Sequence, residues 1–193
     1  MDTHALRQMT VRLHELLVVA ESRGVLDRSL LSRHAYYTAA YHLSTRGFEV
    51  QVLDERSVRQ ADLYLPSVPC RVKVGYTVRR SDGSAIFSLG SGPALANGTF
   101  DLYVVVAYDK DRPDDSWTPY VLSFDEAYEL YTTPKGKTPG FASTPYALYI
   151  ARDLAQFKRM LGRHRMPRTL LEERILTHQE EYAGAWGKAS SGK

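Results

Sequence analysis

One stretch near the middle of the chain, residues 100–108, constrains the fold more than any other. It reads Phe-Asp-Leu-Tyr-Val-Val-Val-Ala-Tyr and is almost continuously β-branched or aromatic. A strand with one face in water alternates apolar and polar residues, whereas a nearly unbroken apolar run is typical of a strand covered on both faces. The rest of the chain must therefore supply a layer for each side of this strand, and we expect a sheet between helices.

Three shorter segments earlier in the chain alternate apolar and polar residues, which is the period-two pattern of a strand. They are residues 48–53, 61–65 and 70–77. In the third segment the apolar side chains fall on one face, and Arg71 and Lys73 fall on the other. Asp62 stands at the start of the second segment. We therefore expect an acid and a lysine to face one another across neighbouring strands.

Turn residues mark the remaining strands. Asp82-Gly83 is typical of a hairpin tip, so we expect residues 74–78 to pair with residues 85–89. Two more strands are expected over residues 119–122 and 146–150, the second of them at an edge.

Helical periodicity flanks this sheet on both sides along the sequence. Two helices are expected before the sheet, over residues 3–22 and 28–46, with Asp27 as the N-cap and Gly47 as the stop of the second. Later helices are expected over residues 123–131, 152–161 and 168–182.

These elements predict one α/β domain with a central mixed β-sheet flanked by helices. We expect the domain to span residues 1–183, with N-terminal helices in 1–46, the sheet core in 47–150 and C-terminal helices in 151–183. The small and polar residues of 184–193 predict a disordered tail.

Composition excludes several classes of protein. The chain is 44% hydrophobic and 24% charged, which is ordinary for a globular protein, and no run approaches the roughly 18 apolar residues of a membrane span. A single cysteine excludes an internal disulfide and a multi-cysteine zinc site, and this Cys70 is expected to be buried and inert. No secretory signal is expected, and we predict a reducing, cytoplasmic location.

The charge distribution indicates where a polyanion could bind. The formal net charge is +3 and the pI is near 8.9, so the chain is mildly basic. No acid occurs from residue 154 to residue 171, but five cations do: Lys158, Arg159, Arg163, Arg165 and Arg168. This basic strip is either a solvated helix face or a surface that contacts phosphates.

The order of these pieces resembles the PD-(D/E)XK nuclease superfamily, especially the small endonuclease-like branch in which a helix ending in a glycine leads into the sheet. The matching pieces are residues 40–50, 61–65, 71–73 and 100–106. In that superfamily an aspartate and the acid of the (D/E)-x-K tripeptide hold a divalent metal, and the lysine helps to align the attacking water. The resemblance implies a restriction-endonuclease-like fold, with Asp62 and Lys73 in the first and last of these roles.

Arg71 stands where the second acid of that pattern belongs, although some members of this branch have glutamine there. A guanidinium group stays protonated and repels a cation, so the resemblance implies a weak Mg²⁺ site with Asp62 as its ligand. A substitute acid could come from the first helix or from the region of the first strand, where the candidates are Glu15, Glu21, Glu49, Asp54 and Glu55.

Two functions remain open on the sequence. The first is a DNA endonuclease with metal-dependent phosphodiester hydrolysis at a degenerate site that contains Asp62, Lys73 and Arg71. The second is a catalytically inactive copy of the same fold that binds DNA, a protein partner or a second copy of the chain. In that case Asp62 forms an ordinary cross-strand ion pair with Arg71 or Lys73. A membrane partner is not expected.

Overall fold

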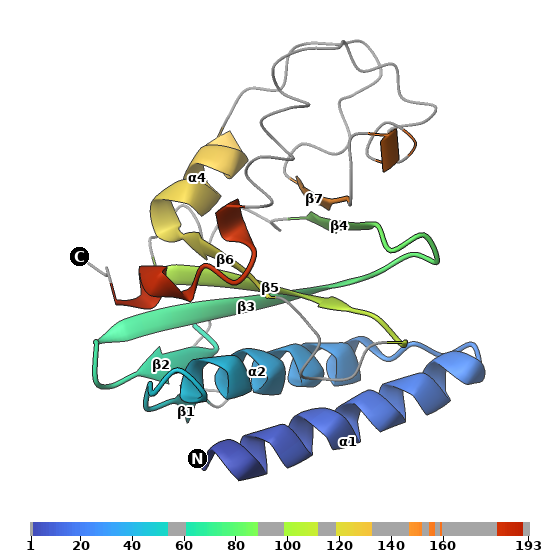
Figure 1. Cartoon of the computed structure of the whole chain (residues 1–193), viewed down its shortest axis with the longest axis horizontal. Helices are drawn as coiled ribbons and strands as arrows, with labels where there is room; N and C mark the ends of the chain where they lie inside the picture. Colours follow the sequence, from blue (N-terminus) through green and yellow to red (C-terminus); the bar gives the residue numbers. More distant parts are fainter. Residues whose placement is uncertain are drawn as a thin grey trace.

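The computed structural model describes residues 2–53, 61–88, 99–111, 119–132, 147–151, 155–156, 159 and 181–190. The described elements form three layers (Figure 1): a pair of N-terminal helices, a five-stranded sheet, and a layer of one helix and a small second sheet. Among these residues no helix is both long and apolar enough to cross a membrane. The α/β class with a mixed sheet flanked by helices is confirmed.

Two long helices form the first layer. They are α1 (Thr3–Ser22) and α2 (Arg28–Ser44), and the side chain of Asp27 accepts a hydrogen bond from the backbone N–H of Ser29, as expected of an N-cap. Helix α2 packs directly on the sheet, and its fully buried Ala39 and Ala40 permit a close approach. Helix α1 packs on α2 from the far side and forms the outermost layer (Figure 1).

The central sheet has five strands in the order β1-β2-β3-β5-β6. Their bounds are Gln51–Val52, Leu63–Leu65, Cys70–Val78, Leu102–Tyr108 and Tyr120–Ser123. Strands β3 and β5 are parallel, and the other neighbours are antiparallel. Every residue of β5 is buried, which confirms that this strand is covered on both faces.

The alternation of β3 separates two hydrophobic clusters. Val72 and Val74 belong to the cluster that includes α1 and α2. On the other face, Tyr103 and Val105 of β5 pack with the side chains of the third layer. Lys73 therefore points away from the helix pair and toward the third layer.

The third layer contains α4 (Phe124–Thr132) and a two-stranded sheet of β4 (Ala85–Ser88) and β7 (Ala147–Ile150). The chain turns at Gly83, whose φ is 80°, but β4 pairs with β7 rather than with β3. The expected pairing of residues 74–78 with residues 85–89 is therefore wrong. Phe87 of β4 instead packs over Gly75 and against Tyr103, so β4 lies on the face of the central sheet, in the cluster of the third layer, rather than beside β3.

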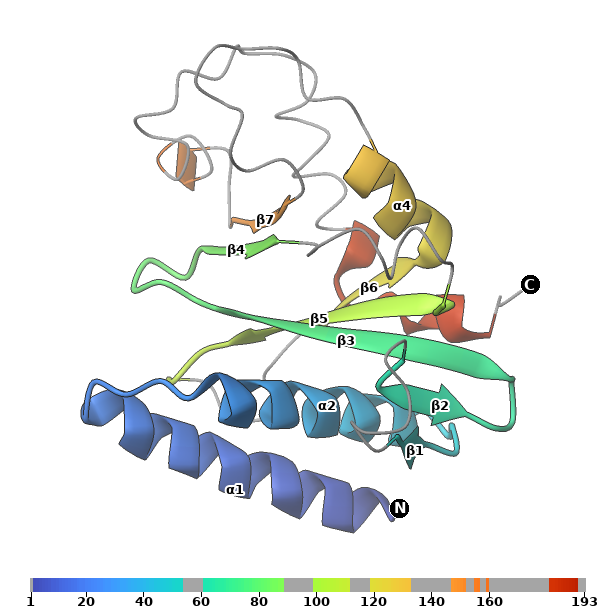
Figure 2. The same cartoon turned by 180° about the vertical axis from the view of Figure 1, so that it is seen from behind.

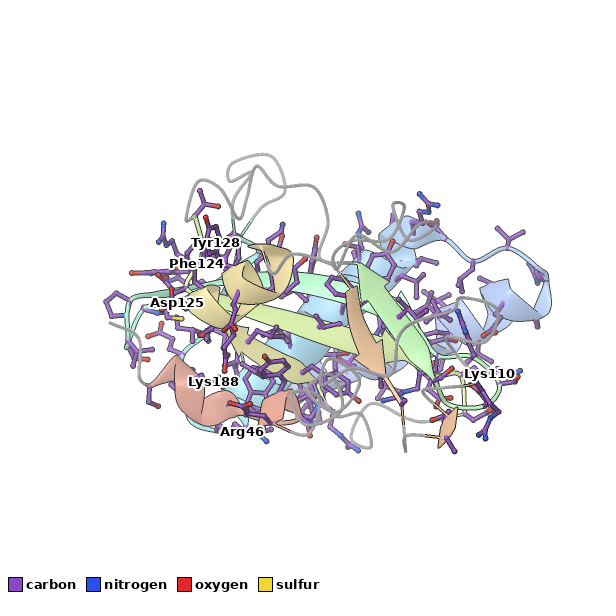
Figure 3. The ribbon with its side chains drawn as sticks, turned by 90° about the horizontal axis from the view of Figure 1, so that it is seen from above. Arg46, Lys110, Phe124, Asp125, Tyr128 and Lys188 are labelled. Carbon is purple, nitrogen blue, oxygen red and sulfur yellow. The ribbon has the colours of Figure 1, made fainter. Side chains whose placement is uncertain are left out.

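The end of the chain differs from the disordered tail that its composition predicts. Residues Trp186–Ala189 form a 3-10 helix, η2, whose Trp186 is buried. The guanidinium of Arg46 lies 5.4 Å from the centre of the Trp186 ring, and the ammonium of Lys188 lies 2.7 Å from Glu126 Oε1 of α4. Lys188 belongs to this terminal segment, and Arg46 lies beside it (Figure 3). Most of residues 151–183 lie outside the described part of the chain.

Glu126 joins this terminal segment to the start of α4. It accepts a backbone hydrogen bond from Ser123 at 2.7 Å, and the Ser123 hydroxyl accepts one from the Glu126 N–H, which completes the expected capping box. Burial raises the pKa of this carboxyl, but hydrogen bonds from Lys188 and Ser123 outweigh burial and lower the pKa overall. Glu126 thus stays ionised and stabilises the docked segment.

Gly75 of β3 provides the first test of this packing. A Cβ at this position would lie 2.7 Å from Cε2 of Phe87 and 3.1 Å from Cε1 of Tyr103, and both rings are buried. We expect Gly75→Ala to destabilise the protein by about 1 to 3 kcal/mol, measured by chemical denaturation. Gly187→Ala is the control, because nothing lies within 4 Å of its added Cβ. Equal stability of the two variants would contradict the close packing of β4 on β3.

Candidate nucleic-acid site

Asp62 and Lys73 form a cross-strand pair. Leu63 pairs with Val72, so the antiparallel register sets Asp62, one residue earlier, opposite Lys73. The ammonium of Lys73 donates to Asp62 Oδ1 at 3.1 Å, and Asp62 Oδ2 accepts the backbone N–H of Val74 at 2.7 Å. Asp62 and Lys73 therefore face one another across neighbouring strands, as expected. Their functional role stays a prediction.

This ion pair lies at the border between the sheet face and solvent. The side chains of Lys73 and Asp62 are 26% and 11% exposed. Tyr103, the β5 neighbour of Lys73, has a pKa that is raised first by burial and then by the negative charge of Asp62. Asp62 is thus held by two donors, and the side chain of Lys73 is partly accessible to solvent.

Arg71 makes a second ion pair, with Asp101. Its backbone N–H donates to Asp101 Oδ2 at 2.7 Å, its Nε donates to the same oxygen at 3.2 Å, and its Nη2 donates to Oδ1 at 3.3 Å. Hydrogen bonding to Asp101 is the main cause of the raised pKa of Arg71. The two side chains are 46% and 36% exposed. Arg71 is therefore a fixed cation whose closest acid is Asp101 and not Asp62.

Sequence reasoning missed Asp101, although it directly precedes the buried strand β5 as Asp62 precedes β2. Its position beside Arg71 depends on the parallel register, in which Val72 pairs with Leu102. Two strand spacings and a two-residue offset place the Cα atoms of Asp62 and Asp101 roughly 12 Å apart. At that separation the two carboxylates do not share one cation.

The described residues do not fit a divalent metal site. Among them, no group of three His, Cys, Asp or Glu side chains could hold a metal ion. Both oxygens of Asp62 already accept hydrogen bonds. Glu15 and Glu21 belong to α1, which lies with α2 on one side of the sheet (Figure 2), whereas Lys73 alternates onto the other face.

Other candidate acids and cations fall partly outside the described residues. Asp54 and Glu55 lie there, as do Lys158, Arg163, Arg165 and Arg168. Of the basic strip, Arg159 is described and exposed, and the positive charge of this residue contributes to the lowered pKa of Asp82, whose main cause is hydrogen bonding from Ser84. Contact of the strip with phosphates stays a prediction.

Cys70 is buried beside this site, as expected from its position in a strand. Burial raises the pKa of its thiol to about 12, and the negative charge of Asp101 adds to the effect. The thiol therefore stays protonated at neutral pH, which makes it a poor nucleophile.

The two ion pairs can be compared by double-mutant cycles. We expect the cycle of Asp62→Asn and Lys73→Met to give a coupling energy of about 1 to 2 kcal/mol in urea denaturation, because this pair is largely shielded from water. Asn at position 62 keeps an acceptor for the N–H of Val74. The matched cycle of Asp101→Asn and Arg71→Met should give less than about 1 kcal/mol, because that pair is more exposed. A larger coupling in the second cycle would contradict the assignment of Asp62 and Lys73 as the protected pair.

Comparisons with known proteins give little further information. The sequence matches no protein-family model and no curated protein. Among solved structures, a bacterial homing endonuclease, I-Ssp6803I, is similar over 86% of this chain and 92% of its own, with 16% identity and a TM-score of 0.49. So low a likeness carries no conclusion on the function of this chain.

Proposed function

We propose that this chain is a DNA-acting protein of the PD-(D/E)XK nuclease type whose metal site has degenerated. The observation that carries the proposal is the Asp62–Lys73 pair, which joins two neighbouring strands of a mixed sheet on the face away from α2. In the superfamily that this chain resembles, an aspartate and a lysine on successive strands both act at the phosphodiester. The sequence order of helix, glycine, strand and aspartate supports the same assignment.

Two cations on this face are suited to a phosphate. The side chain of Lys73 is partly exposed, and its ammonium can turn from Asp62 to a phosphate oxygen, since a lysine is a flexible point charge. The guanidinium of Arg71 is held by Asp101, but the Arg71 side chain is still 46% exposed, so a second oxygen can approach it. We propose a phosphodiester of DNA as the ligand of Lys73 and Arg71.

The proposal also includes a dependence on a metal ion. A cation at Asp62 would have to displace Lys73, and Arg71 adds a fixed positive charge nearby, so we expect Mg²⁺ to bind weakly. Hydrolysis would require a further acid, and Asp54 and Glu55 are the candidates in the sequence near the first strand.

A second candidate function is a catalytically inactive nuclease-fold module that binds DNA or a protein partner. It is favoured by the engagement of both Asp62 oxygens and by the arginine at the position of the second acid. The two candidates differ in whether metal-dependent cleavage occurs. Cleavage that disappears in Asp62→Ala would favour the enzyme, and no cleavage with retained DNA binding would favour the module.

Arg71→Glu tests the degenerate site directly. The substitution removes the fixed cation and restores the acid-x-lysine order, so we expect Mg²⁺ and Mn²⁺ to bind at least about tenfold more tightly in isothermal titration calorimetry. Arg71→Met is the matched control, because it removes the charge without adding an acid, and it should give a smaller gain.

A second substitution tests where the metal ion binds in the Arg71→Glu variant. If the metal binds at Asp62, the double variant Arg71→Glu with Asp62→Ala should lose the gain. If the gain survives, the metal is held by Glu at position 71 and Asp101, and the role proposed for Asp62 is wrong. Circular dichroism checks that each variant is folded.

A further inference from the structure

The outward side of α1 is unusually apolar for the outermost helix of the fold. Its inward side buries Leu6, Leu13 and Leu17 against α2. Its other faces expose Met9 by 40%, Leu16 by 50%, Val18 by 37% and Val19 by 48%. Single exposed apolar residues are common, but several on one helix indicate a surface that another molecule covers.

These residues are arranged around one stripe. Gln8, Arg12, Glu15 and Val19 follow one another at spacings of four, three and four residues, so they lie along one line of the helix opposite its buried side. The surface on this side of α1 is open, and its side chains include those of Gln8, Arg12 and Glu15. The exposed Met9 and Leu16 flank the stripe on one side, and Val11 and Val18 flank it on the other.

The stripe is complementary to itself in charge. If a second copy of α1 runs antiparallel about a twofold axis, a register that sets Arg12 opposite Glu15 of the second copy also sets Glu15 opposite its Arg12. The same register sets Gln8 opposite Val19. Because a twofold axis brings like flanks together, it also brings Met9 beside Leu16 and Val11 beside Val18. One register thus pairs both charges and covers the exposed apolar side chains.

We propose that the chain forms a homodimer through antiparallel pairing of α1 with α1 of a second copy. The 20 residues of α1 offer a contact about 30 Å long, which suits a dimer of micromolar affinity rather than an obligate one. The helix pair covers one side of the sheet (Figure 2), and Lys73 alternates onto the other face, so this contact leaves the Asp62–Lys73 pair of both copies uncovered. The dimer is independent of the function proposed above.

A charge exchange tests the register. In Arg12→Glu, and separately in Glu15→Arg, two like-charged contacts replace two ion pairs in the dimer, and we expect the dimer dissociation constant to rise about tenfold in sedimentation equilibrium of the full chain. The double variant Arg12→Glu with Glu15→Arg restores opposite charges and should recover most of the native affinity. Leu16→Asp should weaken the dimer about a hundredfold, because it acts twice at a buried contact.

Arg80→Glu is the control, because this exposed arginine lies in the turn after β3 and away from α1. It should leave the dimer unchanged. A native chain that stays monomeric from micromolar to hundreds of micromolar concentration would overturn the proposal. Dimerisation that persists in folded Leu16→Asp would also overturn it, and failure of the double charge exchange to recover affinity would overturn the antiparallel register. Circular dichroism and thermal melting show which variants are folded.

Discussion

The parallel pairing of Val72–Val78 with Leu102–Tyr108 is the contact on which the rest of the structure depends. It places the fully buried β5 beside β3 and occupies the second edge of β3. The helices α1 and α2 must then cover one face, while α4 and the small sheet cover the other. Because a one-residue shift would turn Lys73 into the apolar cluster and Val72 toward the site, the burial of β3 and β5 fixes the site as well as the fold.

Two ion pairs lie on one face of the sheet because β3 pairs with β2 along one edge and with β5 along the other. Asp62 meets Lys73 across the antiparallel β2–β3 edge, and Asp101 meets Arg71 across the parallel β3–β5 edge. Lys73 and Arg71 are each neutralised by a carboxylate, but both side chains remain partly exposed. A phosphodiester can therefore replace a carboxylate as the partner of Lys73 without leaving a buried charge unpaired, provided that the N–H of Val74 keeps its bond to Asp62.

The parts of the fold that depend on local pattern could be predicted from the sequence. The bounds of α1 follow from helical periodicity, the burial of β5 follows from its composition, and the meeting of Asp62 with Lys73 follows from alternation. Contacts between distant segments could not be predicted. The Arg71–Asp101 pair requires the parallel register, and the β4–β7 pairing joins two segments that lie far apart in the sequence. The segment of Trp186 docks through contacts with Arg46 and with α4. The composition of residues 184–193 does not predict these contacts.

The central claim is that Lys73 contacts a phosphate of DNA, and its most direct test is the salt dependence of DNA binding. Fluorescence anisotropy with a labelled duplex, repeated over a range of salt concentrations, compares the native chain with Lys73→Met and with Lys73→Arg. We predict that Lys73→Met lowers the affinity and reduces the slope of log K against log salt by about 0.9, as expected for the loss of one phosphate contact, while Lys73→Arg retains most of both. Native affinity and an unchanged slope in a folded Lys73→Met variant would contradict the claim.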